Sequence, residues 1–352
     1  MSDTTRSRRR RVAVWILLAM VLAVPLAPLS GLLLMGEPAQ AQVDEGENQR
    51  ANFWRAVRQG NAGYTAVQGQ ETNVLIQNGG ENRRSLRNGP VKFYGSILLI
   101  VMLVTILGYH AIKGGARIHG GRSGLTVERW SVFERTIHWY TASLFLIMMV
   151  TGLSLLFGRY ALIPVIGKDA FSAYATFAKS LHNYLGPFFA LGLTIEILMW
   201  IRFNFPKKED FEWFAKGGGI VGNGHPHAGR MNGGEKLWFW ILCSFGVAMV
   251  VAGFVLNFPN YGQTRETMQF AHLIHVAAGM VVTAVALGHI YIGTIGSEGS
   301  LEGMVTGRVD TNWAKQHHDL WYEELLEKGV TLEPASRADA SPPPTGATTR
   351  ST

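Results

Sequence analysis

Two histidines lie inside one long apolar segment of this chain, residues 270 to 294. The segment can cross a bilayer, because about 20 helical residues span a hydrocarbon core of roughly 30 Å. His275 and His289 are 14 residues apart. At about 100° per residue they lie within about 40° of each other on one helical face and about 21 Å apart along it. His272 lies about 100° off the face of His289 and is expected to be a bystander. Because ionisable side chains inside membranes usually serve ions, protons or cofactors, this geometry predicts two redox centres at two depths.

The composition indicates a multi-span membrane protein. The 352 residues are 47% hydrophobic and only 16% charged, which is too apolar for an ordinary soluble domain. Much of the net charge of +7 lies in short loops beside apolar segments, where basic residues set membrane orientation. Because Cys243 is the single cysteine, disulfide frameworks, covalently attached haem and iron-sulfur clusters are excluded.

The order of apolar and polar segments predicts the topology. Residues 1–41 have a basic start, an apolar run and Ala39-Gln40-Ala41, typical of an export signal, with an uncleaved anchor as the alternative. Residues 42–92 are a polar exported segment, periplasmic in a bacterial inner membrane protein, in which Asn88-Gly89-Pro90 predicts a turn. The expected transmembrane helices cover about 93–112, 136–157, 179–202, 237–257 and 270–294.

Counting spans from an outward residue 45 places the histidines in two pairs. His182 and His275 share the outer depth, and His138 and His289 share the inner, cytoplasmic depth. Two neutral imidazoles saturate a haem iron, so each pair predicts a six-coordinate haem b that moves electrons.

Two glycines support this interpretation. Gly186 follows His182 by four residues, and Gly279 follows His275 by four. One turn along the ligand's face, a glycine lets a flat macrocycle approach the backbone, although small-residue helix packing is the alternative for each.

The chain from about 128 to 326 resembles the membrane cytochrome b (gamma) subunit of respiratory formate dehydrogenase. The matching segments are ERTIHWY at 134–140, SLHNYLG at 180–186, MNGGEKLWFW at 231–240, HLIHVAAG at 272–279, ALGHIYIGT at 286–294 and GMVTGRVDTNWAKQHHDLWYEE at 303–324. The fold implied is an all-α membrane protein with a four-helix dihaem core. The N-terminal signal or anchor and the helix at 93–113 are additions to it.

The resemblance also implies a function. Catalytic (alpha) and iron-sulfur (beta) subunits in the periplasm would pass electrons through the outer and then the inner haem to menaquinone or ubiquinone at the cytoplasmic side. Asn232, Gly234 and Glu235 would line the quinone site. Glu235 stands where the family usually has glutamine, so it is a candidate to protonate the reduced quinone, with a solvated loop glutamate as the alternative.

Two further residues have open roles. Arg135 suits a haem propionate by its guanidinium geometry, or serves only as a positive-inside arginine. Glu196 lies 14 residues after His182 and is a candidate proton relay near the inner haem, or a partner for Arg202 or a lipid headgroup.

The expected domains follow from these assignments. They are a signal or anchor (1–41), an exported segment (42–92), an extra helix (93–113), the dihaem core (128–300), a cytoplasmic amphipathic tail (301–333) and a disordered C-terminus (334–352). In the tail, Trp313 and Trp321 lie among charges, which predicts a helix along the inner membrane face.

Other functions remain open at this stage. A cytochrome b of a related hydrogenase or thiosulfate reductase keeps the chemistry and changes the donor. A haem-free membrane anchor does not require buried imidazoles, and a proton-relay transporter lacks an inverted repeat here. Formate oxidation itself has no site in this chain, which would be the electron-transfer subunit of the enzyme.

Overall fold

The computed structural model describes residues 49–59, 79–219 and 226–335. The predicted signal or anchor lies outside these ranges, as does the chain beyond residue 335. Residues 49–59 form α3, Gln49–Gln59.

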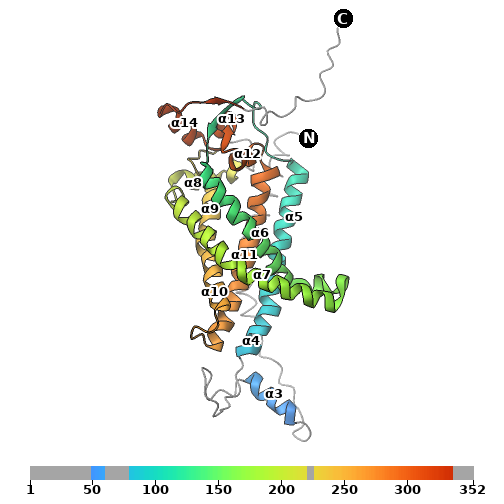
Figure 1. The fold of residues 1–352 in the computed structure, drawn as a ribbon. Helices are drawn as coiled ribbons and strands as arrows, with labels where there is room; N and C mark the ends of the chain where they lie inside the picture. The colour runs from blue at the N-terminus through green and yellow to red at the C-terminus, as the bar shows by residue number, and fades with distance from the viewer. Residues whose placement is uncertain (1–48, 60–78, 220–225, 336–352) are drawn as a thin grey trace. The chain divides into compact units, whose positions relative to one another are not determined.

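Within the described residues, five helical segments are long and apolar enough to cross a membrane. Their α-helices are labelled in Figure 1. They are α4 (Gly79–Leu86) with η1 (Arg87–Val91) and α5 (Lys92–Lys113); α6 (Val132–Ala161); α7 (Ile163–Trp200) with η2 (Ile201–Phe203); α9 (Gly233–Ile241) with η4 (Leu242–Gly246) and α10 (Val247–Asn257); and α11 (Arg265–Tyr291) with η5 (Ile292–Gly296). The prediction of a helical, multi-span membrane protein is confirmed, whereas the signal or anchor and the status of the first helix as an addition remain predictions.

Two local predictions are wrong. Asn88-Gly89-Pro90 does not form a turn but lies in the π-helical stretch η1, inside one helix that runs from residue 79 to 113. The wider π-helical turn accommodates Pro90, which has no N–H to donate. The third helical segment begins at Ile163 rather than near residue 179, and it is kinked at Gly167, whose φ of 80° favours glycine.

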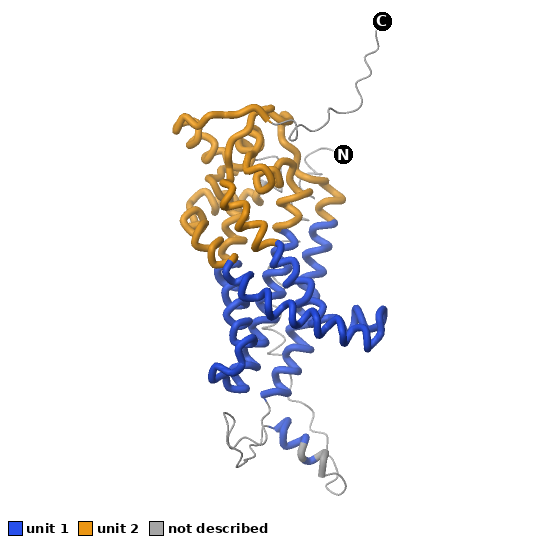
Figure 2. Tube along the Cα trace, in the orientation of Figure 1, with its two compact units in different colours: residues 1–107, 143–191, 241–288 blue, residues 108–142, 192–240, 289–352 orange. Residues whose placement is uncertain are grey.

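The chain forms two compact units, coloured separately in Figure 2. Unit 1 comprises residues 1–107, 143–191 and 241–288, and unit 2 comprises 108–142, 192–240 and 289–352. Because the division falls within the long helices, each span contributes residues to both units. The domain boundaries expected from the sequence remain predictions.

In unit 1, α4 and α5 pack along α11. A Cβ on Gly80 would lie 3.6 Å from Gln269 Nε2, and one on Gly95 would lie 2.7 Å from Met280 Cε. A Cβ on Gly288 would lie 3.6 Å from Met102 Sδ. Because these contacts occur in the same order along both segments, the two helices run parallel. A side chain at position 95 would therefore require the Met280 side chain to shift.

Unit 2 contains a small antiparallel sheet in the order β2-β1-β3, formed by β2 (Arg308–Asp310), β1 (Leu125–Glu128) and β3 (Glu333–Pro334). The shorter helices are α8 (Lys208–Ala215), η3 (Gly217–Gly219), α12 (Ser300–Val305), α13 (Thr311–His317) and α14 (Asp319–Glu327).

The aromatic residues of the tail form the core of unit 2. Trp313 and Trp321, each 4% exposed, pack with Val127 of β1 and Val309 of β2. The prediction that these tryptophans lie along the membrane surface is therefore wrong. Their apolar face is buried inside the protein, because β1 and β2 supply the partner surface that periodicity alone could not reveal.

Candidate functional site

His182 and His275 face each other in unit 1. His182 comes from α7 and His275 from α11, and their ring centroids are 6.0 Å apart with an interplanar angle of 81°. The pair expected from span counting is therefore brought together.

Hydrogen bonds fix the tautomers of this pair. His275 Nδ1 lies 2.8 Å from the Met249 carbonyl oxygen. Because a carbonyl only accepts, Nδ1 donates and Nε2 keeps its lone pair. His182 Nδ1 lies 2.9 Å from Thr151 Oγ1, which donates to the Ile147 carbonyl at 2.8 Å and so accepts from the imidazole. Both Nε2 atoms are thus prepared as metal ligands.

His138 and His289 face each other in unit 2. The ring centroids are 6.3 Å apart, with an interplanar angle of 63°. Trp238 stacks on the His289 ring at 5.4 Å and 20°. His138 Nδ1 is buried and has no hydrogen-bond partner within the described residues. This second expected pair is also brought together.

The two separations suit one metal ion between each pair. With metal–nitrogen bonds of about 2.0 Å and about 1.1 Å from nitrogen to ring centroid, two imidazoles on one ion have centroids about 6.2 Å apart. In the described ranges, no group of three or more His, Cys, Asp or Glu side chains could hold a metal. The pairs therefore fit a haem, whose porphyrin supplies the other four nitrogen ligands.

Two glycines that the sequence alone did not single out lie against the rings of His182 and His275. A Cβ on Gly152 of α6 would lie 3.3 Å from His182 Cε1, and one on Gly253 of α10 would lie 3.2 Å from His275 Cε1. Each follows a methionine by four residues, Met148 and Met249. This repeated Met-x-x-x-Gly spacing was the available signal, but only the fold shows what the glycines touch.

Gly186 and Gly279 have more room. A Cβ at Gly186 would lie 3.6 Å from Met148 Cε, and one at Gly279 would lie 3.6 Å from Met249 Sδ. Both distances are ordinary van der Waals contacts. The protein around these two glycines therefore does not itself require glycine there.

Asn232 and Glu235 begin helix α9 in unit 2. Glu235 Oε2 accepts from the Asn232 N–H at 2.8 Å, and Asn232 Oδ1 accepts from the Glu235 N–H at 2.9 Å. This reciprocal pair caps the helix. Gly234 lies beneath Trp213, whose Cη2 would be 2.9 Å from a Cβ there. The three residues expected at the quinone site thus lie together at one helix end.

Glu235 is held by a buried arginine. Arg129 donates through Nη2 to Glu235 Oε1 at 3.0 Å, and its side chain is 2% exposed. Its guanidinium carbon lies 5.0 to 5.3 Å from the rings of Trp130, Trp313 and Trp321. Burial lowers the pKa of Arg129, and the Glu235 carboxylate opposes that effect. Sequence analysis missed Arg129 as a partner because the two residues are 106 positions apart.

His318 lies beside the same carboxylate. It is 1% exposed, and its Nε2 lies 3.8 Å from Glu235 Oε2. His318 Nδ1 donates to the Gly229 carbonyl at 2.8 Å. Burial first, and then the Arg129 charge, hold the pKa of His318 well below its usual value. His318 is therefore neutral at physiological pH, with the Nε2 lone pair facing Glu235.

The remaining predicted residues have protein partners. Arg135 Nη1 donates to the Val305 carbonyl at 2.5 Å, while its Nε is buried without a hydrogen-bond partner in the described chain. Glu196 is 8% exposed and hydrogen-bonds the Thr141 side chain. No ion pair joins Glu196 to Arg202 among the described residues.

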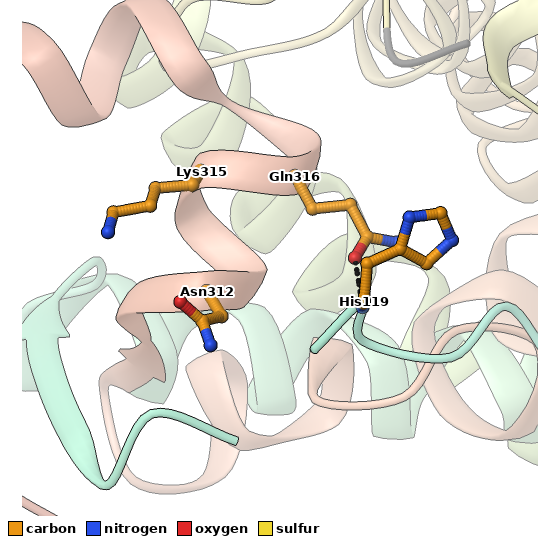
Figure 3. Close-up of a pocket in the computed structure, with 4 residues that line it drawn as sticks. All are labelled: His119, Asn312, Lys315 and Gln316. Atoms are coloured by element: carbon orange, nitrogen blue, oxygen red, sulfur yellow. Dashed lines mark hydrogen bonds between the residues drawn. The ribbon is translucent and has the colours of Figure 1, made fainter. Parts of the chain in front are cut away.

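A shallow polar hollow lies on unit 2, lined by His119, Asn312, Lys315 and Gln316 (Figure 3). The Gln316 side chain accepts from the His119 N–H at 2.7 Å. The Gln316 amide nitrogen donates to the Arg117 carbonyl at 3.0 Å. These side chains stabilise the chain segment before β1, and none of the histidine pairs lines the hollow.

Known proteins resemble most of this site-bearing region. The family model for prokaryotic cytochrome b561 matches residues 129–307, about half of the chain. The nitrate-inducible formate dehydrogenase cytochrome b556(Fdn) subunit of Escherichia coli K12 is 29% identical over 208 residues, covering 56% of this chain and 91% of that protein. The formate dehydrogenase cytochrome b556 subunit of Haemophilus influenzae is 33% identical over 204 residues, covering 55% and 82%.

Proposed function

Because this chain belongs to the prokaryotic cytochrome b561 family, we propose that it is the cytochrome b subunit of a membrane-bound formate dehydrogenase. The resemblance expected from the sequence motifs is confirmed by the similarity to formate dehydrogenase cytochrome b556 subunits. The chain is a multi-pass membrane protein. The observation that carries the function is the presence of two histidine pairs at a spacing that suits one haem iron each.

In this proposal, His182 and His275 hold one haem b, and His138 and His289 hold the second. Each haem, when bound, accepts and passes on single electrons. The protein's own role is to present the Nε2 lone pairs, which the Met249 carbonyl and the Thr151 hydroxyl orient for His275 and His182. If each iron took both histidines of a pair as ligands, it would have no open position for oxygen, and the sites would serve electron transfer.

Electrons enter from the catalytic (alpha) and iron-sulfur (beta) subunits at the periplasmic side and leave to menaquinone or ubiquinone at the cytoplasmic side of the inner membrane. This direction follows from the topology expected from the sequence. The parallel packing of α4 and α5 on α11 supports that topology, because both segments are expected to run inward. We place α5, which precedes the family match, as an addition to a four-helix core.

The quinone site is proposed at the start of α9. Trp213 covers Gly234, and the Asn232 and Glu235 side chains cap the helix beside it. The capping leaves the Asn232 amide N–H₂ available to a carbonyl of the quinone headgroup. Glu235, opposite the neutral His318, is the group that passes a proton to the reduced headgroup. Glu196, hydrogen-bonded to Thr141, is placed on the proton path near the inner haem.

The test compares two activities of the purified complex. Formate oxidation with a soluble dye needs only the partner subunits, whereas formate-dependent quinone reduction needs this chain. We expect His138→Ala and His275→Ala to keep the dye activity and to lose quinone reduction. If formate fails to reduce the b haems of the wild-type complex while hydrogen reduces them, or while thiosulfate reoxidises haems that a quinol has reduced, the assignment to formate dehydrogenase is wrong.

A further inference from the structure

Two half-buried arginines before α5 share one helical face. Arg83 of α4 and Arg87 of η1 are four residues apart, so they lie on the same side. The Nε atom of each is buried and has no hydrogen-bond partner in the described part of the chain. Between them, Arg84 points the other way and pairs with Glu81 at 2.9 Å. Arg87 Nη1 donates to Asn88 Oδ1 at 3.3 Å, so the unsatisfied atoms of the two arginines are their Nε atoms.

This half-buried face lies against the start of α11. Gly80 is close to Gln269, and the charges of Arg83 and Arg87 both act on the His272 imidazole. His272 Nδ1 is also buried without a hydrogen-bond partner inside the described ranges. His272 precedes His275 by one helical turn, and the two imidazoles are electrostatically coupled. Three buried nitrogen atoms without a hydrogen-bond partner therefore belong to side chains near enough to influence one another electrostatically, and one of them lies a helical turn from His275.

The surroundings of these nitrogens are positively charged. The charged neighbour that acts on Arg87 is Arg83, and those that act on Lys92 are Arg87 and Arg159. Like charges brought together and partly desolvated are costly unless an anion compensates them. The described residues around Arg83 and Arg87 supply no such carboxylate. The cluster has the composition of an anion site.

We propose that Arg83, Arg87 and His272 bind the propionate groups of the haem held by His182 and His275. This inference rests on the proposed function. A haem carries two carboxylates at one edge, and guanidinium groups pair with carboxylates through two parallel hydrogen bonds. The buried Nε and Nδ1 atoms and the position of His272 one helical turn from His275 favour a carboxylate inside the protein over a lipid headgroup. Because residues 79–92 precede the family match, this chain's N-terminal addition completes the haem site.

The expected consequence is a higher reduction potential for this haem. Reduction adds a negative charge to the haem, and nearby cations stabilise the reduced form. Removing both arginines, in Arg83→Gln/Arg87→Gln, should shift the balance between oxidised and reduced haem about tenfold, a fall of about 59 mV for a one-electron couple. The other haem should keep its potential.

The experiment is a redox titration of the purified full-length protein, followed optically. His275→Ala identifies which haem belongs to the His182 pair, and absence of haem in wild-type protein would overturn the proposed function itself. The matched control is Arg84→Gln, an exposed arginine in the same helix. The conservative variant Arg83→Lys/Arg87→Lys should restore most of the potential, since it keeps both charges.

Two results would overturn the inference while leaving the proposed function intact. One is that both haem reduction potentials of the double glutamine variant match those of the wild type. The other is that both haem potentials shift equally, or that Arg84→Gln causes the same shift, which would indicate a general structural effect. Unchanged potentials with loss of bound lipid or of the partner subunits would assign the cluster to those anions instead.

Discussion

Replacing Gly279 or Gly186 by alanine tests whether these glycines make room for a haem or only for the packing of helices. In the protein itself, the new Cβ would meet only Met249 Sδ or Met148 Cε, each at 3.6 Å. Alanine is favoured over glycine in a helix by about 1 kcal/mol. A bundle without haem should therefore tolerate both substitutions or gain stability from them.

If a haem lies against Gly279 and Gly186, both alanine substitutions should instead be unfavourable. An extra carbon in a filled site costs about 1 to 3 kcal/mol. With about 1.4 kcal/mol per tenfold change in affinity, the haem of the His182–His275 pair should bind about 5-fold to 150-fold more weakly. The haem of the other pair should be unaffected.

The assay is the haem-to-protein ratio of purified Gly279→Ala and Gly186→Ala, with the thermal midpoint of each. Gly108→Ala is the control, because a Cβ at Gly108 in α5 would meet nothing within 4 Å. Full haem content together with raised stability in both variants would refute the reasoning, because the glycines would then serve helix packing alone.

Three further predictions concern unit 2. Glu235→Gln removes the counter-charge of buried Arg129, so it should lower the thermal midpoint by the equivalent of about 1 to 3 kcal/mol. The loss should be nearer the lower value because Glu235 is partly exposed. The variant should also reduce quinone more slowly, and an unchanged rate would show that Glu235 does not transfer the proton. The pKa of His318 is lowered in the folded state, so the unfolded chain takes up a proton below about pH 6.5 that the folded chain does not. As the pH falls through this range, the free energy of unfolding should decrease by up to about 1.4 kcal/mol per pH unit. Unfolding curves of His318→Gln should lack this part of the pH dependence, and identical slopes for the variant and the wild type would contradict the prediction. Gly115→Ala should destabilise the protein by about 1 to 3 kcal/mol, because its Cβ would lie 2.7 Å from the Ile295 carbonyl oxygen, a backbone atom that cannot easily move; a thermal midpoint equal to that of wild type would show that the backbone yields.

The histidine pairs could be predicted because helix periodicity and span counting are local rules. The 14 residues between His275 and His289 determine their shared face, and the alternation of spans then pairs each with a histidine of another helix. The structure places both pairs together as expected. Ligation of iron by the four histidines remains a prediction.

Contacts between residues far apart in the sequence could not be predicted in the same way. Arg129 reaches Glu235 across 106 positions of sequence, and no periodic pattern links them. The tail tryptophans suggested a membrane-surface helix because their spacing is amphipathic. Periodicity reports that a face is apolar and does not report whether lipid or a small sheet covers it.

The segment before α5 also could not be predicted from local sequence rules. Proline usually breaks a helix, so Asn88-Gly89-Pro90 predicted a turn. In the structure the helix continues through η1, and this continuity is what carries Arg83 and Arg87 to α11.

The central claim is most directly tested by a reduced-minus-oxidised optical spectrum of the purified protein with a haem-to-protein ratio, recorded for wild type, His275→Ala and His138→Ala. We predict two low-spin b haems in wild type and one in each variant, with different haems lost in the two variants. Intact wild-type protein without haem, or two haems retained in both variants, would contradict the account.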